Sequence, residues 1–177
     1  MKTIAFLLLA LTTCFCARGQ VFVTQRSSIL FFSDAPLEDI KAENKKVESA
    51  IDLSSGIIEF RVSMKEFEFD KSLMRQHFNE KYVHTSKYPH AFFRGNVEGL
   101  SVQSGQRQVK AVGKLTLHGV TRDVAVAGTL DVQPGSLRIR AKFLLRLEDY
   151  EVPRPQLLWQ NIAEEVEVTL DLTYKPQ

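Results

Sequence analysis

The sequence predicts an all-β domain that forms either a sandwich or a closed barrel. Apolar residues alternate with polar ones in several segments, which is typical of strands with one buried and one solvated face. Short turn signals separate these segments, and only one segment has helical spacing. The chain has 177 residues, 44% of them hydrophobic and 25% charged, so it can bury one sizeable core or enclose an apolar pocket.

Residues 1–19 have the features of a secretory signal peptide. Lys2 precedes the apolar run 4–11, which is too short to span a bilayer, and small residues stand at Ala17 and Gly19. We therefore expect a domain over residues 20–177 and an exported protein. An alternative is a membrane-anchored lipoprotein, because the residues that end in Cys14 resemble a lipobox.

Cleavage after Gly19 would change both the cysteine content and the charge. It removes Cys14 and Cys16, which are the two cysteines, so the mature chain would have no disulfide and no Cys-ligated metal. It also removes two basic residues and no acidic one, so the basic residues fall from 23 to 21 and match the 21 acidic ones. A net charge of zero speaks against nucleic acid as a partner.

Alternation predicts the strands in order along the chain. The regular candidates cover residues 58–64, 91–98, 109–118, 123–132, 138–146 and 165–172, and less regular ones lie at 21–24, 29–33 and 41–52. The turn signals between them are Ser54-Ser55-Gly56, Ser104-Gly105, His118-Gly119 and Pro134-Gly135. Such short links favour antiparallel neighbours, and about eight or nine strands suit a sandwich or a barrel.

One segment, residues 70–82, predicts a helix. Asp70 or Ser72 could cap its start, and the residues at helical spacing are Leu73, Met74, His77, Phe78 and Lys81. Residues 34–40 could add a short helical turn.

Small residues share the inward-facing positions with large apolar ones. They are Gly95, Ala111, Gly113, Gly128 and Ala141. They could pack against large residues in a filled core, with glycines bending the sheet, or they could leave a lumen open for an elongated apolar guest. The pattern alone favours neither.

Three blocks resemble the YceI-like lipid- and polyisoprenoid-binding family. Residues 67–70 with 73–95 are similar to its helix, Lys-Tyr-Pro turn and following strand. Residues 113–130, GKLTLHGVTRDVAVAGTL, are similar to its hairpin and are the most specific block. Residues 143–153 with 162–166 are similar to its terminal strands. The resemblance covers nearly all of the chain after residue 20.

The resemblance implies a lipocalin-like antiparallel eight-stranded barrel with one short helix near one end. It implies an apolar lumen for a long-chain isoprenoid or similar amphiphilic lipid, export to the periplasm, and no catalysis. The chain also lacks the common motifs of nucleophile elbows, phosphate-binding loops and zinc proteases. We therefore predict a binding protein without a cofactor or a transmembrane span, and the sequence leaves a homodimer open.

The predicted ligand-binding residues are apolar and lie on the inward faces of the strands. They are Ile58, Phe60, Val62, Phe93, Leu115, Leu117, Val126, Phe143 and Leu170. Burial of an apolar chain contributes roughly 25 cal/mol per Å², so no reactive group is required. Two other readings stay open: a filled structural barrel without a ligand, and a lipid-modifying enzyme on a barrel scaffold.

The histidines and one aromatic segment are further candidates. We expect His118 to fix a turn through a ring hydrogen bond, with Gly119 in a backbone conformation that other residues avoid, and not to contact a ligand headgroup. His77 and His84 are too far apart along a helix to share one zinc ion. Asp149-Tyr150 and Trp159 could form either the pocket mouth or a plug at one end of the barrel.

Overall fold

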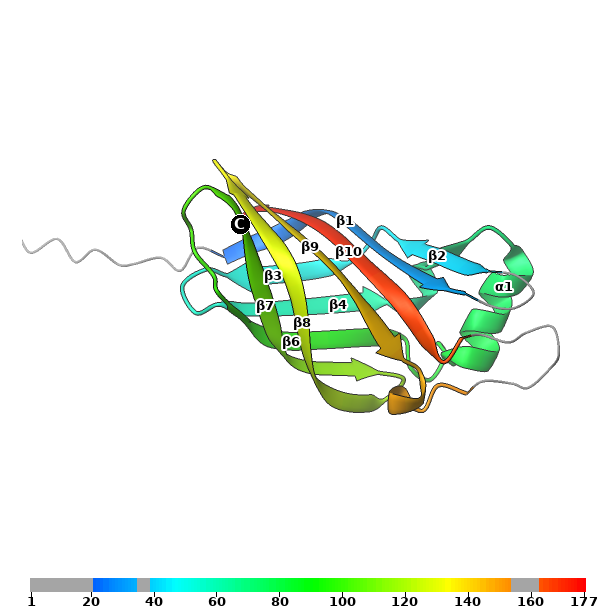
Figure 1. The fold of residues 1–177 in the computed structure, drawn as a ribbon. Coiled ribbons are helices and arrows are strands. Elements are labelled where there is room, and N and C mark those ends of the chain that lie inside the picture. Colours follow the sequence, from blue (N-terminus) through cyan, green and yellow to red (C-terminus); the bar gives the residue numbers. More distant parts are fainter. Residues whose placement is uncertain (1–20, 35–38, 154–162) are drawn as a thin grey trace, which may run out of the picture.

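The computed structural model describes residues 21–34, 39–153 and 163–177, and within them the chain forms a closed antiparallel barrel (Figure 1). The strands are β1 (Val21–Ser33), β2 (Ile40–Asn44), β3 (Glu48–Asp52), β4 (Ile57–Ser63), β5 (Glu68–Phe69), β6 (His90–Glu98), β7 (Gly105–Leu117), β8 (Val120–Gln133), β9 (Ser136–Arg146) and β10 (Glu165–Pro176). The all-β prediction is confirmed, and the six regular candidates correspond to strands. The candidates at 21–24 and 29–33 belong to the single strand β1, and the candidate at 41–52 divides into β2 and β3.

The barrel closes through β1. This strand pairs with β10 along one edge, and along its other edge it pairs first with β3 and then with β2. Because β2 and β3 together occupy one position, the closed circuit has eight strand positions. The two-residue strand β5 pairs with β2 and is not counted as a position of this circuit. The fold is therefore a lipocalin-like eight-stranded barrel, and the sandwich alternative is wrong.

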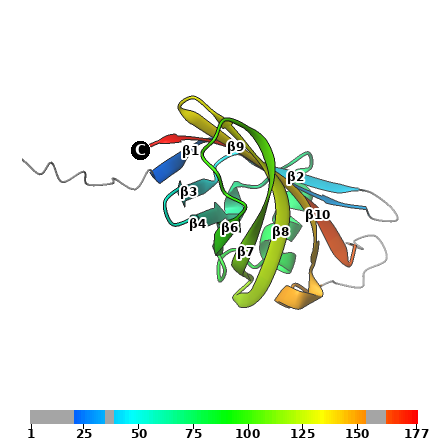
Figure 2. The same ribbon diagram turned by 60° about the vertical axis from the view of Figure 1, so that its left-hand side comes forward.

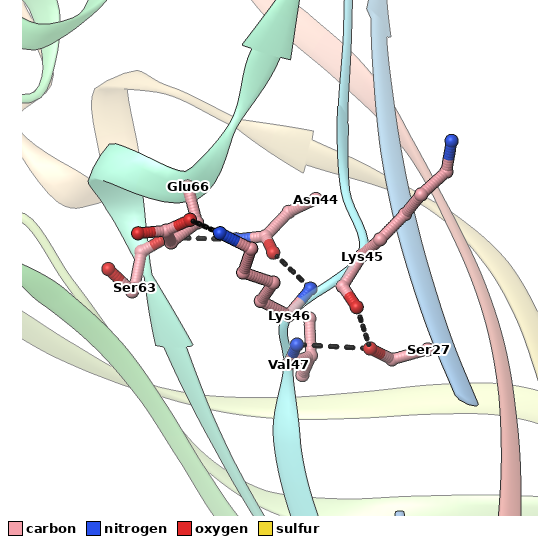
Figure 3. Close-up of polar contacts among 7 residues, drawn as sticks. All are labelled: Ser27, Asn44, Lys45, Lys46, Val47, Ser63 and Glu66. Atoms are coloured by element: carbon pink, nitrogen blue, oxygen red, sulfur yellow. Dashed lines mark hydrogen bonds and ion pairs between the residues drawn. The ribbon is translucent and has the colours of Figure 1, made fainter. Parts of the chain in front are cut away.

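The gap between β2 and β3 is bridged by hydrogen bonds (Figure 3). Asn44 is fully buried; its amide nitrogen donates to the Ser63 carbonyl at 2.8 Å, and its side-chain oxygen accepts from the Lys46 amide at 2.8 Å. The Ser27 hydroxyl on β1 accepts from the Val47 amide at 3.0 Å. Side chains thus form hydrogen bonds with backbone groups where strand pairing stops. These bonds allow β2 and β3 together to fill one strand position of the barrel.

The predicted helix is present, with a different start and end. Helix α1 (Ser72–His77) continues as a π-helix (Phe78–Tyr82), and its N-cap is Lys71 with no side-chain cap hydrogen bond. The proposed capping by Asp70 or Ser72 is therefore wrong. The helical turn predicted at residues 34–40 falls mostly outside the described residues, and Ile40 begins β2.

The barrel has two distinct ends. Helix α1, the short 3-10 helix η3 (Glu148–Tyr150) and the β7–β8 turn lie at one end, which we call the helix end (Figure 1). The β8–β9 hairpin and the end of β10 lie at the opposite end, which we call the far end; Figure 2 shows this hairpin and η3 on opposite sides of the molecule. A further 3-10 turn, η1 (Met64–Glu66), follows β4.

Candidate functional site

A cavity of about 210 Å³ lies inside the barrel. Inward-facing residues of the strands line it, together with residues of the helical segment, and almost all of the side chains are apolar. Among the described residues of the lining, Tyr82 carries the only hydroxyl, and burial raises the pKa of this phenol. The site is therefore an apolar lumen and not a cluster of reactive groups.

All nine residues predicted from alternation line this lumen. They are Ile58, Phe60, Val62, Phe93, Leu115, Leu117, Val126, Phe143 and Leu170. They come from β4, β6, β7, β8, β9 and β10, so the inward face was identified correctly on every one of these strands. Whether they contact a ligand remains a prediction.

Small residues explain why the middle of the barrel is hollow. Gly128 on β8 stands directly opposite Ala141 on β9 and opposite Val109 on β7, and Ala111 follows two positions along β7. All of them line the lumen. At these positions the side chains are too short to reach the axis, so the open-lumen reading holds for Ala111 and Ala141. Gly128 also permits a close backbone approach, because a Cβ atom there would lie 2.7 Å from the Arg140 carbonyl oxygen.

The other two glycines follow the alternative reading. Gly95 on β6 and Gly113 on β7 pair with each other, and neither belongs to the lining. A Cβ atom on Gly113 would lie 2.4 Å from the Gly95 Cα atom, which is closer than real contacts allow. These glycines therefore permit a close approach of two backbones, as expected where a barrel wall bends.

Large side chains fill the far end. Leu172 and Tyr174 on β10 are fully buried, and Leu137 and Leu130 are nearly so. The Tyr174 hydroxyl lies 2.8 Å from the Ser49 hydroxyl, which in turn donates to the Glu59 carbonyl at 2.7 Å. Burial raises the pKa of Tyr174 above its ordinary value, so the phenol stays neutral and hydrogen-bonded.

Aromatic rings fill the helix end. Phe78, from the π-helix, stacks on Phe31 of β1 with ring centroids 5.5 Å apart. Phe67 and Phe69 join the same group, with centroids 5.6 Å and 5.1 Å from Phe78. The helical segment thus places Phe78 in a cluster of aromatic rings that covers this end of the barrel. These contacts account for the position of the helical segment.

His118 joins three segments at the helix end. Its Nε2 lies 3.0 Å from the His84 Nδ1, and its Nδ1 lies 3.2 Å from the Tyr150 carbonyl oxygen, to which a protonated Nδ1 donates. Its ring packs edge-on against Tyr88, with centroids 4.5 Å apart. His118 and Gly119 both have positive φ, 51° and 80°, as a tight hairpin turn requires. The turn-fixing role predicted for His118 agrees with these contacts.

The surroundings of His118 disfavour its charged form. Burial lowers the pKa of the imidazole, and the nearby His84 and Lys87 lower it further, although the hydrogen bond to the Tyr150 carbonyl opposes them. His77 and His90 do not take part in this contact. Among the residues that the structure describes, no three His, Cys, Asp or Glu side chains gather in a way that could hold a metal ion.

The segment after β9 contributes two residues to the wall of the lumen. Tyr150 is 3% exposed and is not part of the lining, whereas its neighbours Leu147 and Val152 are. The buried position of Tyr150 outside the lining speaks against the pocket-mouth alternative for this residue, and Trp159 lies outside the described residues.

Several lining residues were not predicted because they lie in irregular segments. Examples are Phe67 after η1, Val83 after the π-helix and Val152 after η3. Met64 in η1 ended the alternating segment 58–64 but was not among the predicted ligand-binding residues. Period-two alternation gives no signal in such segments, and only Phe78 stood out, through its helical spacing.

Charged side chains lie on the outer face of the barrel. Arg138 and Asp171 form a two-bond pair across β9 and β10, with nitrogen–oxygen distances of 2.8 and 2.5 Å. Lys142 and Glu167 pair at 2.8 Å across the same strands. In the described part of the chain, no helix is both long enough and apolar enough to cross a bilayer.

An eight-stranded antiparallel barrel around an apolar lumen, with one short helix over one end, defines the class of lipocalin-like barrels. Residues 21–174 match the YceI-like domain, and the chain belongs to this family. A comparison with curated proteins finds no match.

Solved structures share the fold at low sequence identity. A polyisoprenoid binding domain from Saccharophagus degradans implicated in plant cell wall breakdown has a TM-score of 0.77 and 15% identity, and the match covers 90% of this chain and 100% of that one. Burkholderia cenocepacia BcnA has a TM-score of 0.70 and 17% identity, over 83% and 95% of the two chains. A Campylobacter jejuni YCEI protein has a TM-score of 0.63 and 13% identity, over 81% and 88%.

Proposed function

We propose that this protein binds the apolar chain of an isoprenoid or similar amphiphilic lipid in its lumen and does not catalyse a reaction. The observation that carries the proposal is the apolar cavity of about 210 Å³ inside the barrel. Protein interiors pack as densely as organic crystals and rarely contain voids larger than a water molecule. A cavity of this size is therefore a feature that the fold maintains at the expense of packing, which favours a guest.

The lining supplies the chemistry that such a guest needs. Apolar burial contributes roughly 25 cal/mol per Å² without directional bonds, so chains of different structure can bind the same walls. The related fold in the Saccharophagus degradans domain, which is described as polyisoprenoid binding, supports the same ligand class. The filled-barrel alternative is disfavoured by the cavity, and the enzyme alternative is disfavoured by a lining in which the described residues present no acid, base or nucleophile beyond the Tyr82 phenol.

The test is to fill the lumen without changing the rest of the barrel. Ala141→Leu places a larger side chain into the cavity, and Ala127→Leu makes the same change at an exposed position of the neighbouring strand β8. Binding of farnesol is measured by calorimetry and by the rise in the melting temperature of the protein. We expect Ala141→Leu to weaken binding at least tenfold and Ala127→Leu to leave it unchanged.

Two outcomes would contradict the proposal. One is that the unaltered protein neither releases heat nor gains thermal stability with farnesol and contains no lipid when its organic extract is examined by mass spectrometry. The other is that the folded Ala141→Leu protein binds farnesol as well as the unaltered protein does.

We also propose that the protein is exported and that residues 1–19 are removed. The support is the sequence pattern around Lys2, Ala17 and Gly19. Mass spectrometry of the protein isolated from its native cells should show a chain that begins at Gln20. A chain that begins at a lipidated Cys14 would establish the lipoprotein alternative, and a chain that keeps residues 1–13 would contradict export by either route.

A further inference from the structure

Resting on the proposed function, we infer that a guest enters the lumen sideways, through an opening in the barrel wall between β8 and β9, and leaves its polar end group outside this opening. We call the opening the window and define it by residues 120–126 of β8 and residues 143–146 of β9. A tail longer than the lumen can then be bound, because its remainder extends through the window.

Strand pairing defines the window. Strand β8 pairs with β7 along nearly its whole length, and β9 does so with β10. Between β8 and β9, however, the pairs run only from Gln133 and Ser136 at the hairpin to Gly128 and Ala141. Over the described remainder of the two strands the register contains no further pair, and Figure 1 shows β8 and β9 diverging toward the helix end.

The sequence of the two edges does not itself prevent pairing. Residues 120–126 and 143–146 contain no proline and no glycine, and the valines and aromatic residue among them suit a strand. A continued register would place Val126 opposite Phe143. Unpaired backbone groups are unfavourable unless water reaches them, so the separation needs a cause elsewhere in the fold.

The 3-10 helix η3 supplies this cause. The Arg122 Nε donates to the Asp149 carbonyl at 3.0 Å, and the His118 Nδ1 lies 3.2 Å from the Tyr150 carbonyl oxygen. These contacts tie the start of β8 and the β7–β8 turn to η3, which follows closely after β9. The start of β8 is therefore bordered by η3 in place of β9, and the window has a frame of β8, β9, their last pair and η3.

The window leads directly into the lumen. Val124 and Val126 on one edge and Phe143 and Leu145 on the other all line the cavity. All four are half-buried. An apolar chain that passes between the two edges therefore contacts apolar side chains on both sides until it reaches the interior.

The outer rim of the window suits a guest that is partly enclosed. Leu144, at the middle of one edge, is 63% exposed, which is the largest exposure among the described large apolar residues, and Ala125 on the other edge is also exposed. Lys142 and Arg146 flank Leu144 and form ion pairs with acidic residues of β10. Enclosing a charged end group in the uncharged lining would cost several kcal/mol in desolvation, whereas outside the window it stays in water.

The two ends of the barrel are poor routes by comparison. At the far end Leu172 and Tyr174 are fully buried. At the helix end Phe78 stacks on Phe31 with ring centroids 5.5 Å apart. A guest that entered at either end would have to displace these packed groups, whereas a guest that enters through the window separates no paired strands.

The first test locates the end group of a bound guest. A farnesyl chain that carries benzophenone in place of the hydroxyl group is bound to the unaltered full-length protein and irradiated. Mass spectrometry of peptides then identifies the residues to which it becomes attached. We expect attachment within residues 120–126 and 143–146, and we expect an excess of farnesol to suppress it.

This test separates the window from the proposed function. If the attachment that farnesol suppresses lies around Phe78 or around Tyr174, lipid binding stands and the window is wrong. If farnesol suppresses no attachment and gives no heat in calorimetry, the proposed function itself is wrong.

The second test closes the window with a covalent bridge. Ala125→Cys and Leu144→Cys place one thiol on each edge, and the shortest bismaleimide that joins them spans the opening. Cys14→Ser and Cys16→Ser leave no other thiol in the full-length chain. The bridged protein is loaded with radiolabelled farnesol, and its exchange for unlabelled farnesol is followed over time. We expect the bridge to slow exchange at least about tenfold, because the guest must pass the bridged opening.

The matched control joins the same two strands where they are already paired. Thr129→Cys and Arg140→Cys, in the same background, place two thiols at directly opposed positions of β8 and β9. Because this bridge lies outside the window, it should change the exchange rate by less than about twofold. Equal exchange rates in the two bridged proteins would overturn the window as the route of entry.

Discussion

The middle of the barrel and its far end are built from the same strands with the same alternation, yet one is hollow and the other is solid. On β10, Leu170 lines the lumen and is half-buried, whereas Leu172, two residues later on the same face, is fully buried. The difference comes from the size of the paired residues on the neighbouring strand β9. Leu170 pairs with Ala141, and Leu172 pairs with Ile139.

This contrast teaches that the size of a few facing residues decides between a container and a core. In the middle of the barrel, three inward positions have side chains too short to reach the axis: Ala111, Gly128 and Ala141. At the far end, large buried side chains fill the axis: Leu130, Leu137 and Tyr174. A barrel of eight strands is just wide enough for either outcome.

The largest expected effect is a loss of stability when the packing of the far end is disrupted. Leu172→Ala should lower the free energy of unfolding by about 3 kcal/mol, because it leaves a void among packed neighbours. Leu170→Ala, the same change two residues away, should cost about 1 kcal/mol, because its side chain already borders empty space. Urea denaturation of both variants measures the two values. Equal losses would mean that the lumen is packed as tightly as the far end.

The next effect concerns the bend between β6 and β7. Gly113→Ala should destabilise the protein by about 1–3 kcal/mol, because its Cβ would collide with the backbone of β6. Gly105→Ala is a control on the same strand where a Cβ meets no atom within 4 Å, although its φ of 117° adds strain of its own. Thermal unfolding compares the two. A loss well below about 1 kcal/mol for Gly113→Ala would show that β6 and β7 separate easily.

The smallest effect concerns the helix end and depends on pH. The folded protein holds the pKa of His118 below its ordinary value of about 6.5, so the unfolded chain takes up a proton first as the pH falls. This contribution to stability is complete above about pH 6.5 and is lost as the pH falls through the lowered pKa. Unfolding measured between pH 8 and pH 5 should therefore show a decline.

The matched variant for this decline is His118→Asn, because asparagine tolerates the positive φ of the turn. The difference in unfolding free energy between the unaltered protein and the variant should shrink as the pH falls. A difference that stays constant over this range would mean that His118 does not titrate in it.

The strands could be predicted from sequence because each has one wet face and one apolar face. The six regular segments correspond to β4, β6, β7, β8, β9 and β10, and all nine predicted lumen residues face inward. Alternation assigns a side chain to a face and does not say what stands opposite it. Gly128 and Ala141 lie side by side because of the register between β8 and β9, and the lumen depends on this register. The sequence alone does not give the register, so it left a filled barrel and a hollow barrel equally open.

The contacts at the helix end were beyond the sequence for a different reason. His84 and His118 are 34 residues apart and meet only because the loop after the π-helix returns to the β7–β8 turn. The cap of α1 was predicted wrongly because Asp70 and Ser72 have suitable side chains, but the helix begins from an extended Lys71 without a side-chain bond.

The closure of the barrel by β1 and β10 has a consequence for folding. Phe22 on β1 pairs with Pro176 on β10, so the wall has a gap until these two distant segments come together. Contacts between such distant segments form slowly, and the incomplete chain keeps its interior exposed. Pairing of β1 with β10 is therefore expected to complete the barrel late in folding, after the local hairpins have formed.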